Sequence, residues 1–476
     1  MKKLKAIATV ILWLIASLPA VTLAQSGLTE YGLRGIPQAS VQNPAFRPHA
    51  SLVIGLPGMS SVSAGAYNTS FSFDDIFVEK PADDSLHLDL TRPIGSKTDI
   101  NYFSENIAVD LLMLGFKIDR TFLSMGIRNR LTSRVYYTTD LLKFVWQGNA
   151  DYINQQFNLT GSGVYQEHLN NYYLGLSFPV AYRIDMGVRV NFLQGLSNIA
   201  TQTPQLALLT RTSQQTGYEL IAKTDFQVHT SGFSQFLSDS VNFSPVDYFL
   251  AFNNIGFSLD VGINARIGDQ FTVQASVTDF GKIYWYGNPE TYNSGADEVN
   301  FSGVEYDFTT DNESSPGQVY LDSLSSLLHI KESKNIYTTA LRTKVFVNGQ
   351  YNTLNKKNRF NLLFAGRFLE ESFEYALSVG YTFAPSEKFA VKLNYSYLKY
   401  APLNLGLGFY FTFKPFQIYF VTDNVAAFIY PTAQKYAGVH VGINILIPST
   451  YKNDIPTQKQ IGKTIIAEPE STGTKD

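Results

Sequence analysis

The feature that most constrains this chain is a regular alternation of apolar and polar residues. From Ala437 to Ile445 every second residue is apolar, and Gly, His or Asn stands between. The same period of two runs from Phe373 to Phe383 and resumes from Phe389 to Tyr397. This period puts alternate side chains on opposite faces of a β-strand. We therefore predict an all-β fold whose strands carry one apolar face and one small or polar face.

Very short turns separate many of these segments. Gly268-Asp269 lies between two alternating runs, and Lys414-Pro415 lies between two others. A tight turn with Gly and Asp between strands is typical of a β-hairpin, whose strands are antiparallel. The sequence therefore indicates an antiparallel sheet of consecutive hairpins.

Composition and the position of arginine distinguish a membrane barrel from a soluble sandwich. Only 16% of the 476 residues are charged and 14% are aromatic, while the mean hydropathy of -0.06 is too low for a bundle of membrane helices. In the strand predicted around 123–135, the face opposite Leu123 and Met125 carries Arg128, Arg130 and Arg134. Charged side chains of this kind suit a water-filled lumen, and the apolar face suits lipid. Because lipid does not tolerate an open sheet edge, we predict a closed transmembrane antiparallel β-barrel.

Counting the alternating segments gives about fourteen strands, an even number as bacterial barrels have. The predicted strands are 60–72, 108–118, 121–136, 171–182, 186–197, 255–267, 271–280, 339–353, 358–368, 373–383, 388–398, 403–413, 416–424 and 436–447. The long connections 73–107, 137–170, 198–254 and 281–338 are expected to be extracellular, and the short turns periplasmic. Residues 206–230 are expected to prolong strands beyond the membrane. Helical patches are expected in the loops at 141–147 and 320–328.

The N-terminus predicts the compartment. Lys2, Lys3 and Lys5 precede an apolar run over 6–18, and Thr22-Leu23-Ala24 follows. This is the pattern of a secretory signal peptide, residues 1–24, since the run is short of the roughly 20 residues that a spanning helix needs. We expect the mature chain to start at Gln25 and to reside in the outer membrane of a Gram-negative bacterium, with lipid as its surroundings.

Two further regions flank the barrel predicted at 51–447. Residues 25–50 contain Gly32, Gly35, Pro37, Pro44 and Pro48, which oppose regular structure, and we expect them to form a hatch that plugs the lumen. Residues 448–476 are polar and are expected to be a flexible periplasmic tail.

A resemblance to a known family rests on several segments. Val41-Gln42-Asn43-Pro44-Ala45-Phe46 resembles the Asn-Pro-Ala element found early in FadL-type outer-membrane transporters. The segments 187–196, 256–262 and 275–285 follow it in order, and together they resemble an uncharacterised family of Bacteroidota outer-membrane proteins that is similar to FadL-type and PorV barrels. The resemblance implies fourteen strands and an N-terminal hatch, with Asn43, Pro44 and Ala45 as the candidate hatch motif.

No catalytic, phosphate-binding or metal motif stands out, and the chain has no cysteine, so we predict no enzyme activity and no cofactor. His440 and Asn444 share the lumenal face of the last strand. Some outer-membrane lipases use a strand-borne His, but no spacing fixes a nucleophile here, and a hydrogen-bonding role is favoured. Asp260 and Glu374 are expected to neutralise lumenal arginines.

The lumenal cations are the strongest candidate ligand contacts. Arg128, Arg130 and Arg134 lie about 7 to 14 Å apart along one strand face, and Arg189 lies on a similar face. They could meet the anionic head group of an amphiphile, or they could be the paired charges that fill any barrel of this size. The net charge of -3 gives no support to a nucleic-acid partner.

Two functions stay open at this point. The first is passive uptake or export of small hydrophobic or amphipathic molecules through a FadL-like barrel whose hatch moves. The second is a non-transporting, PorV-like scaffold that holds a protein partner through its extracellular loops or its C-terminal tail.

Overall fold

The computed structural model describes residues 27–80, 85–95, 100–213, 217–232, 245–295, 297–301, 330–369 and 372–448. The signal peptide predicted at 1–24, the helical patch predicted at 320–328 and the tail predicted beyond Pro448 lie outside these residues.

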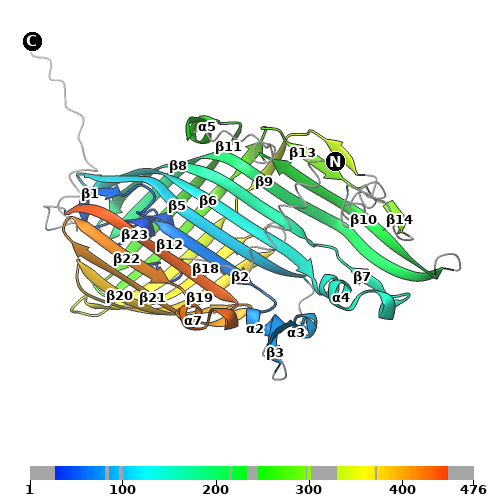
Figure 1. Cartoon of the computed structure of the whole chain (residues 1–476). Helices are drawn as coiled ribbons and strands as arrows, with labels where there is room; N and C mark the ends of the chain where they lie inside the picture. Colours follow the sequence, from blue (N-terminus) through cyan, green and yellow to red (C-terminus); the bar gives the residue numbers. More distant parts are fainter. Residues whose placement is uncertain are drawn as a thin grey trace, which may run out of the picture.

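The chain forms a closed antiparallel β-barrel of 14 strands, as the alternation predicted (Figure 1). The wall strands are β5 (Ile100–Ile118), β6 (Thr121–Thr138), β8 (Gly163–Ala181), β9 (Ile184–Ser213), β11 (Asn254–Ile267), β12 (Phe271–Trp285), β17 (Lys344–Asn352), β18 (Asn358–Phe368), β19 (Phe373–Ser386), β20 (Phe389–Leu398), β21 (Ala401–Phe413), β22 (Phe416–Thr422) and β23 (Tyr436–Pro448), preceded by a first strand in two pieces, β1 (Ala50–Gly55) and β2 (Val62–Asn68). Both pieces pair with β5 on one side and with β23 on the other, and this pairing closes the barrel.

The first strand differs from its prediction. It begins at Ala50 rather than near residue 60, and residues 56–61 leave the ladder between β1 and β2. On β23, Gly55 faces Asn444 whereas Val62 faces Val441, so these six residues oppose only two. Pro57 and Gly58 break the alternation here, which is why sequence periodicity missed β1.

One end of the barrel carries only short turns and is here named the short-turn end. Its hairpins reverse at 119–120, 182–183, 268–270, 353–357, 387–388 and 414–415. The opposite, long-loop end carries α2 (Phe73–Ile76), β3 (Phe77–Lys80), β4 (Ser85–Leu88), α3 (Thr91–Ile94), α4 (Thr139–Gln147), η2 (Ala150–Tyr152), β7 (Gln156–Asn158), α7 (Ala426–Ile429) and η4 (Pro431–Ala433). The helix predicted at 141–147 is confirmed by α4, where the Thr138 side chain accepts a hydrogen bond from the backbone N–H of Leu141.

The two strands of one hairpin extend beyond the barrel wall, as expected for residues 206–230. β9 continues to Ser213 and pairs with β10 (Gly217–Ser231) far beyond the wall (Figure 1). Four short strands extend the sheet on this side: β13 (Glu290–Asn293), β14 (Asp297–Phe301), β15 (Lys331–Ser333) and β16 (Tyr337–Ala340). Helix α5 (Pro245–Leu250) lies in the connection between β10 and β11.

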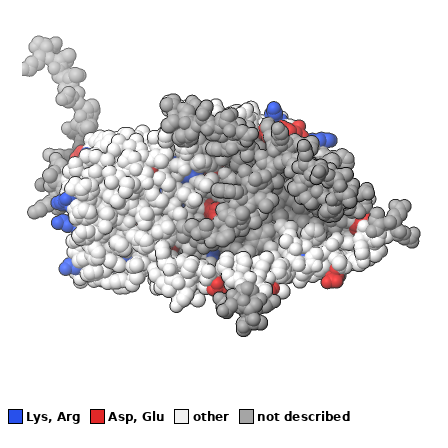
Figure 2. Space-filling view, in the orientation of Figure 1, with Lys and Arg blue, Asp and Glu red and all other residues white. Residues whose placement is uncertain are grey.

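The outer face of the wall is apolar. In mid-strand, Leu362 of β18, Val379 of β19 and Leu393 of β20 are each about half exposed. Their sequence neighbours Leu363, Ser378 and Asn394 point inward and are fully buried. Figure 2 shows few charged side chains over the wall, and a group of Lys and Arg at the short-turn end. Among the described residues, no helix is long and apolar enough to span a bilayer.

Candidate functional site

Residues 27–49, here named the hatch, lie inside the barrel. Their only regular element is the short helix η1 (Pro37–Val41). Leu28 and Tyr31 pack with Phe346 and Leu363 of the wall, and a second cluster joins Leu33 and Ile36 to the same side of the lumen. This part of the lumen is therefore apolar, whereas the alternation predicted a small or polar face. The difference arises because the wall here packs against the hatch instead of facing water.

The Asn-Pro-Ala element contacts the wall at the strands whose sequences carried the resemblance. Asn43 Nδ2 donates to the carbonyl groups of Ile263 and Ala275, both at 3.3 Å. A Cβ on Gly187 of β9 would lie 2.1 Å from the carbonyl carbon of Pro44, and a Cβ on Gly262 of β11 would lie 2.1 Å from Asn43 Oδ1. Glycine is required at both positions, because the hatch backbone passes directly over Gly187 and the Asn43 side chain lies directly over Gly262.

Buried polar groups of the wall hold the first part of the hatch. The Asp423 carboxylate accepts hydrogen bonds from the backbone N–H groups of Gly27 and Thr29, both at 2.7 Å. Burial raises the pKa of Asp423, although the hydrogen bonds from Thr29 oppose that rise. On β20, Lys392 Nζ donates to the carbonyl of Tyr31 at 2.6 Å. The start of the hatch is thus fixed by side chains that satisfy its own backbone.

His440 of β23 is a second attachment point. Its Nδ1 lies 3.0 Å from Glu30 Oε2 of the hatch, and its Nε2 lies 2.8 Å from both Ser61 Oγ and Tyr419 Oη. Ser, His and Glu are in the order of a catalytic triad, but Ser61 is completely buried and shares Nε2 with Tyr419. A substrate carbonyl has no approach to the Ser61 oxygen, so the geometry fits the hydrogen-bonding role.

Asn444, the partner that the sequence placed beside His440, also binds the hatch. Its amide exchanges two hydrogen bonds with Gln38, at 2.8 and 3.0 Å. Its Nδ2 also donates to Gln417 of β22.

Three of the predicted cations have a carboxylate partner from another strand. Arg128 lies 3.5 Å from Asp110, Arg130 forms two hydrogen bonds with Asp279, and Arg134 lies 3.4 Å from Glu374. Glu374 also pairs with Arg367, as expected for a neutralising acid. The described contact of Asp260 is with the backbone N–H of Asp279. Arg189 instead donates to Ser40 of the hatch and stacks over Tyr173.

Three of the four predicted arginines meet at one cavity. Arg128, Arg130 and Arg189 line a central space of about 150 Å³, together with Lys344 and Arg367. Arg134 does not line it, since its guanidinium lies 4.2 Å from the ring centre of Tyr102 and is fully buried. Asp110 and Asp279 were missed from the sequence. The signal that could have found them is an acidic residue on the inward face of a strand whose neighbours carry arginine.

A large cavity lies at the long-loop end among the described residues and is here named the vestibule. Its volume is about 660 Å³. Its aromatic lining includes Tyr67, Tyr102, Tyr136, Tyr165, Tyr375 and Tyr400. The Arg342 guanidinium lies 3.8 Å from the ring centre of Tyr165, and its Nη1 is buried without a hydrogen-bond partner among the described residues. An apolar space edged by phenol groups and one available guanidinium can accommodate an amphipathic molecule.

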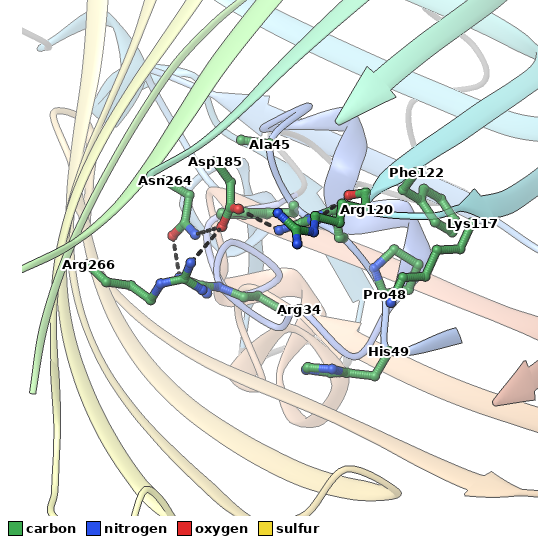
Figure 3. A pocket seen from close by; sticks show the side chains of 12 residues that line it. Arg34, Ala45, Pro48, His49, Lys117, Arg120, Phe122, Asp185, Asn264 and Arg266 are labelled. Carbon is green, nitrogen blue, oxygen red and sulfur yellow. Dashed lines mark hydrogen bonds and ion pairs between the residues drawn. The ribbon is translucent and has the colours of Figure 1, made fainter. Parts of the chain in front are cut away.

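At the short-turn end, one carboxylate connects the hatch to the wall (Figure 3). Asp185 of β9 forms a short ion pair with Arg47 of the hatch and accepts a hydrogen bond of 3.1 Å from Asn264 Nδ2. Arg34 Nη2 of the hatch donates to Asn264 Oδ1 at 2.6 Å, and Arg266 lies 3.5 Å from Asp185. Asp185 therefore faces several guanidinium groups at once. None of the described residues form a cluster suited to hold a metal ion.

The fold and the lumen define a closed transmembrane-type barrel with an internal hatch. Residues 44–423 match a family of unknown function, DUF5723, and the chain belongs to that family. No curated protein matches the chain significantly.

The solved structures similar to this chain include two toluene transporters. One is TbuX of Ralstonia pickettii, 8% identical over 87% of this chain and 94% of that chain, with a TM-score of 0.41. The other is TodX of Pseudomonas putida, 9% identical over 89% and 97%, with a TM-score of 0.37. A FadL homologue of Pseudomonas aeruginosa is 10% identical over 86% and 93%, with a TM-score of 0.39.

Proposed function

We propose that this chain is an outer-membrane channel for small hydrophobic or amphipathic molecules, and that the hatch moves to open it. The apolar outer wall suits the hydrocarbon region of a bilayer. The short-turn end would face the periplasm, since short turns lie on that side in bacterial barrels.

The observation that carries the proposal is the position of the hatch between two sets of cavities. The vestibule lies at the long-loop end, and two cavities lie at the short-turn end. The hatch is joined to the surrounding wall by individual hydrogen bonds and ion pairs, such as those of Asp423, His440 and Asp185. Contacts of this kind can be exchanged without breaking the barrel ladder, so the hatch can shift while the wall stays closed.

The lining of the vestibule supports the class of ligand. Its tyrosine rings offer apolar faces with hydroxyl edges, and Arg342 offers a donor that no described side chain occupies. The predicted lumenal arginines are less available to a ligand than the sequence suggested, because Asp110, Asp279 and Glu374 already pair with Arg128, Arg130 and Arg134. A role of these arginines as ligand contacts stays a prediction.

A reversible lock on the hatch tests the proposal. A Cβ on Gly406 would lie 3.2 Å from Thr29 Cβ, slightly less than the roughly 3.5 to 4.5 Å of a disulfide, so a small outward shift of the hatch allows the bond. The chain has no native cysteine, so the pair Thr29→Cys and Gly406→Cys can form only this bond. In proteoliposomes, uptake of a labelled fatty acid or of toluene should stop after oxidation and return after reduction.

The controls are Thr29→Cys alone and the pair Thr29→Ala with Gly406→Cys, in which the Thr29 Oγ1 that would lie 2.0 Å from the new Cβ is absent. Both should transport under either condition. Equal uptake by the oxidised and the reduced double variant, with the disulfide confirmed by mass spectrometry, would contradict a moving hatch. Loss of uptake in every variant would instead indicate that the substitutions damage the barrel, and electrophoretic heat modifiability would detect that damage. The scaffold hypothesis stays a prediction, and co-purification of one defined protein would support it.

A further inference from the structure

The cavity at the short-turn end is lined by more cations than acids. We name it the basic mouth; its volume is about 450 Å³. Its charged lining consists of Arg34, Arg183, Arg266, Lys356, Lys357 and Arg359, against the acids Asp269 and Glu387. Asp269 is mostly exposed and pairs with Arg183 at 2.9 Å. Most of the positive charge in this cavity therefore has no carboxylate within it.

Several guanidinium groups here lack hydrogen-bond acceptors among the described residues. Arg34 Nε and Arg266 Nε are buried without a hydrogen bond, and Arg266 Nη2 is buried with no contact closer than its ion pair. The ion pair of Arg266 with Asp185 is long, at 3.5 Å. No described carboxylate forms an ion pair with Arg359. Buried donors without acceptors are costly, and a bound anion would satisfy them.

The pKa of Arg34 also indicates an excess of positive charge in this cavity. Burial, together with the positive charges of Arg359 and Arg266, lowers the pKa of Arg34 to about 10, although the charge of Asp185 opposes the shift. Arg34 belongs to the hatch and lies inside the barrel, so its charge cannot serve to contact lipid head groups outside the wall. Arg34 differs in this respect from Lys356 and Lys357, which lie in a turn at the rim of the barrel.

We infer that the basic mouth is an oxoanion site, in which Arg34 of the hatch and Arg266 and Arg359 of the wall bind a carboxylate, phosphate or sulfate group. The planar fork of arginine matches the paired oxygens of such groups. The site is built from both hatch and wall, so an anion bound there would compete with Asp185 for Arg266. The bound anion would weaken the ion-pair network of Asp185, which also holds Arg47 of the hatch. Binding of the anion would therefore be coupled to the position of the hatch.

Equilibrium binding tests this inference without any transport measurement, so its failure is separate from failure of the proposed function. The full chain, purified in an uncharged detergent, is titrated calorimetrically with inorganic phosphate at constant ionic strength set by chloride. We expect one saturable site. Arg34→Gln and Arg266→Gln should each weaken binding by about tenfold or more, the loss expected for a charged hydrogen bond.

Lys388→Gln is the matched control. It removes a positive charge from an exposed turn at the same end, outside the cavity, and should leave the affinity unchanged. Unfolding midpoints of all variants establish that the barrel is intact. The absence of saturable heat in the parent chain, or equal affinity in Arg34→Gln, would overturn the inference.

A second titration identifies the source of the anion. A short alkyl phosphate, used below its micelle concentration, is compared with inorganic phosphate on the same variants. Equal affinities would assign the site to a free anion. Tighter binding of the alkyl ester, lost in Arg34→Gln, would assign it to the head group of an amphiphile.

Discussion

At the residue scale, the lumen is organised by a few acids that each balance more than one cation. Asp279 shows this most clearly, since it pairs with Arg130 at 2.6 Å and with Lys344 at 2.9 Å. The arginines could be predicted because they stand out on one face of a strand. Of their partners, Glu374 was expected to neutralise arginines, whereas Asp110 and Asp279 were missed, because they come from other strands and only barrel closure brings them into place.

Asp279→Ala should destabilise the barrel strongly. It would leave Arg130, which is mostly buried, and the partly exposed Lys344 without their acid, and breaking a buried pair costs about 3 to 5 kcal/mol. Asp269→Ala is the control, since Asp269 is mostly exposed in its pair with Arg183 and should cost at most about 1 kcal/mol. Urea unfolding of both variants in lipid vesicles measures the difference. Equal destabilisation would contradict the balancing role of Asp279.

Gly187→Ala should displace the hatch while leaving the wall folded. Its Cβ would lie 2.1 to 2.3 Å from backbone atoms of Pro44 and Ala45, far closer than van der Waals contact allows, so the hatch must move. A cysteine at Ala45, which is 2% exposed, should then react with a bulky thiol reagent at least about tenfold faster, equivalent to about 1.4 kcal/mol. Gly349→Ala is the control, because its Cβ would meet nothing within 4 Å. Unchanged labelling in Gly187→Ala would mean that the element lies elsewhere.

At the scale of elements, alternation predicted the wall strands well and the hatch poorly. A strand with lipid on one side and the lumen on the other must alternate, so its period is visible without any knowledge of its neighbours. The hatch has no period of its own, because its residues are held by individual contacts with several wall strands and not by one repeating pattern. For the same reason Arg34 was not predicted as a site residue, and β1 was missed where residues 56–61 interrupt the ladder.

Leu362→Arg tests the orientation of the wall. Leu362 is 59% exposed in mid-strand, whereas its neighbour Leu363 is fully buried against the hatch. A charge on the lipid face near the bilayer midplane should cost about 2 to 4 kcal/mol in a folding titration into vesicles. Leu362→Ala should cost much less, since it adds no charge to the lipid face. Comparable values for the two variants would mean that this face does not meet lipid.

At the scale of the whole molecule, the two ends of the barrel differ in chemistry. The long-loop end opens on a tyrosine-lined vestibule, and the short-turn end opens on the basic mouth. Figure 2 shows the same asymmetry on the surface, with Lys and Arg gathered at the short-turn end. The hatch separates the two, so the barrel presents an aromatic entrance on one side and an anion-binding space on the other.

The pairing of the first strand with the last has a consequence for biogenesis. β1 and β2 meet β23, so the seam of the barrel cannot form until the chain has been made as far as Pro448. A chain that stopped before β23 would keep two open edges, which a bilayer does not tolerate. The hatch leads directly into β1 and must already be inside when the seam closes. Placement of the hatch and closure of the wall are therefore coupled. A chain that lacks β23 would form neither the closed barrel nor the hatch inside it.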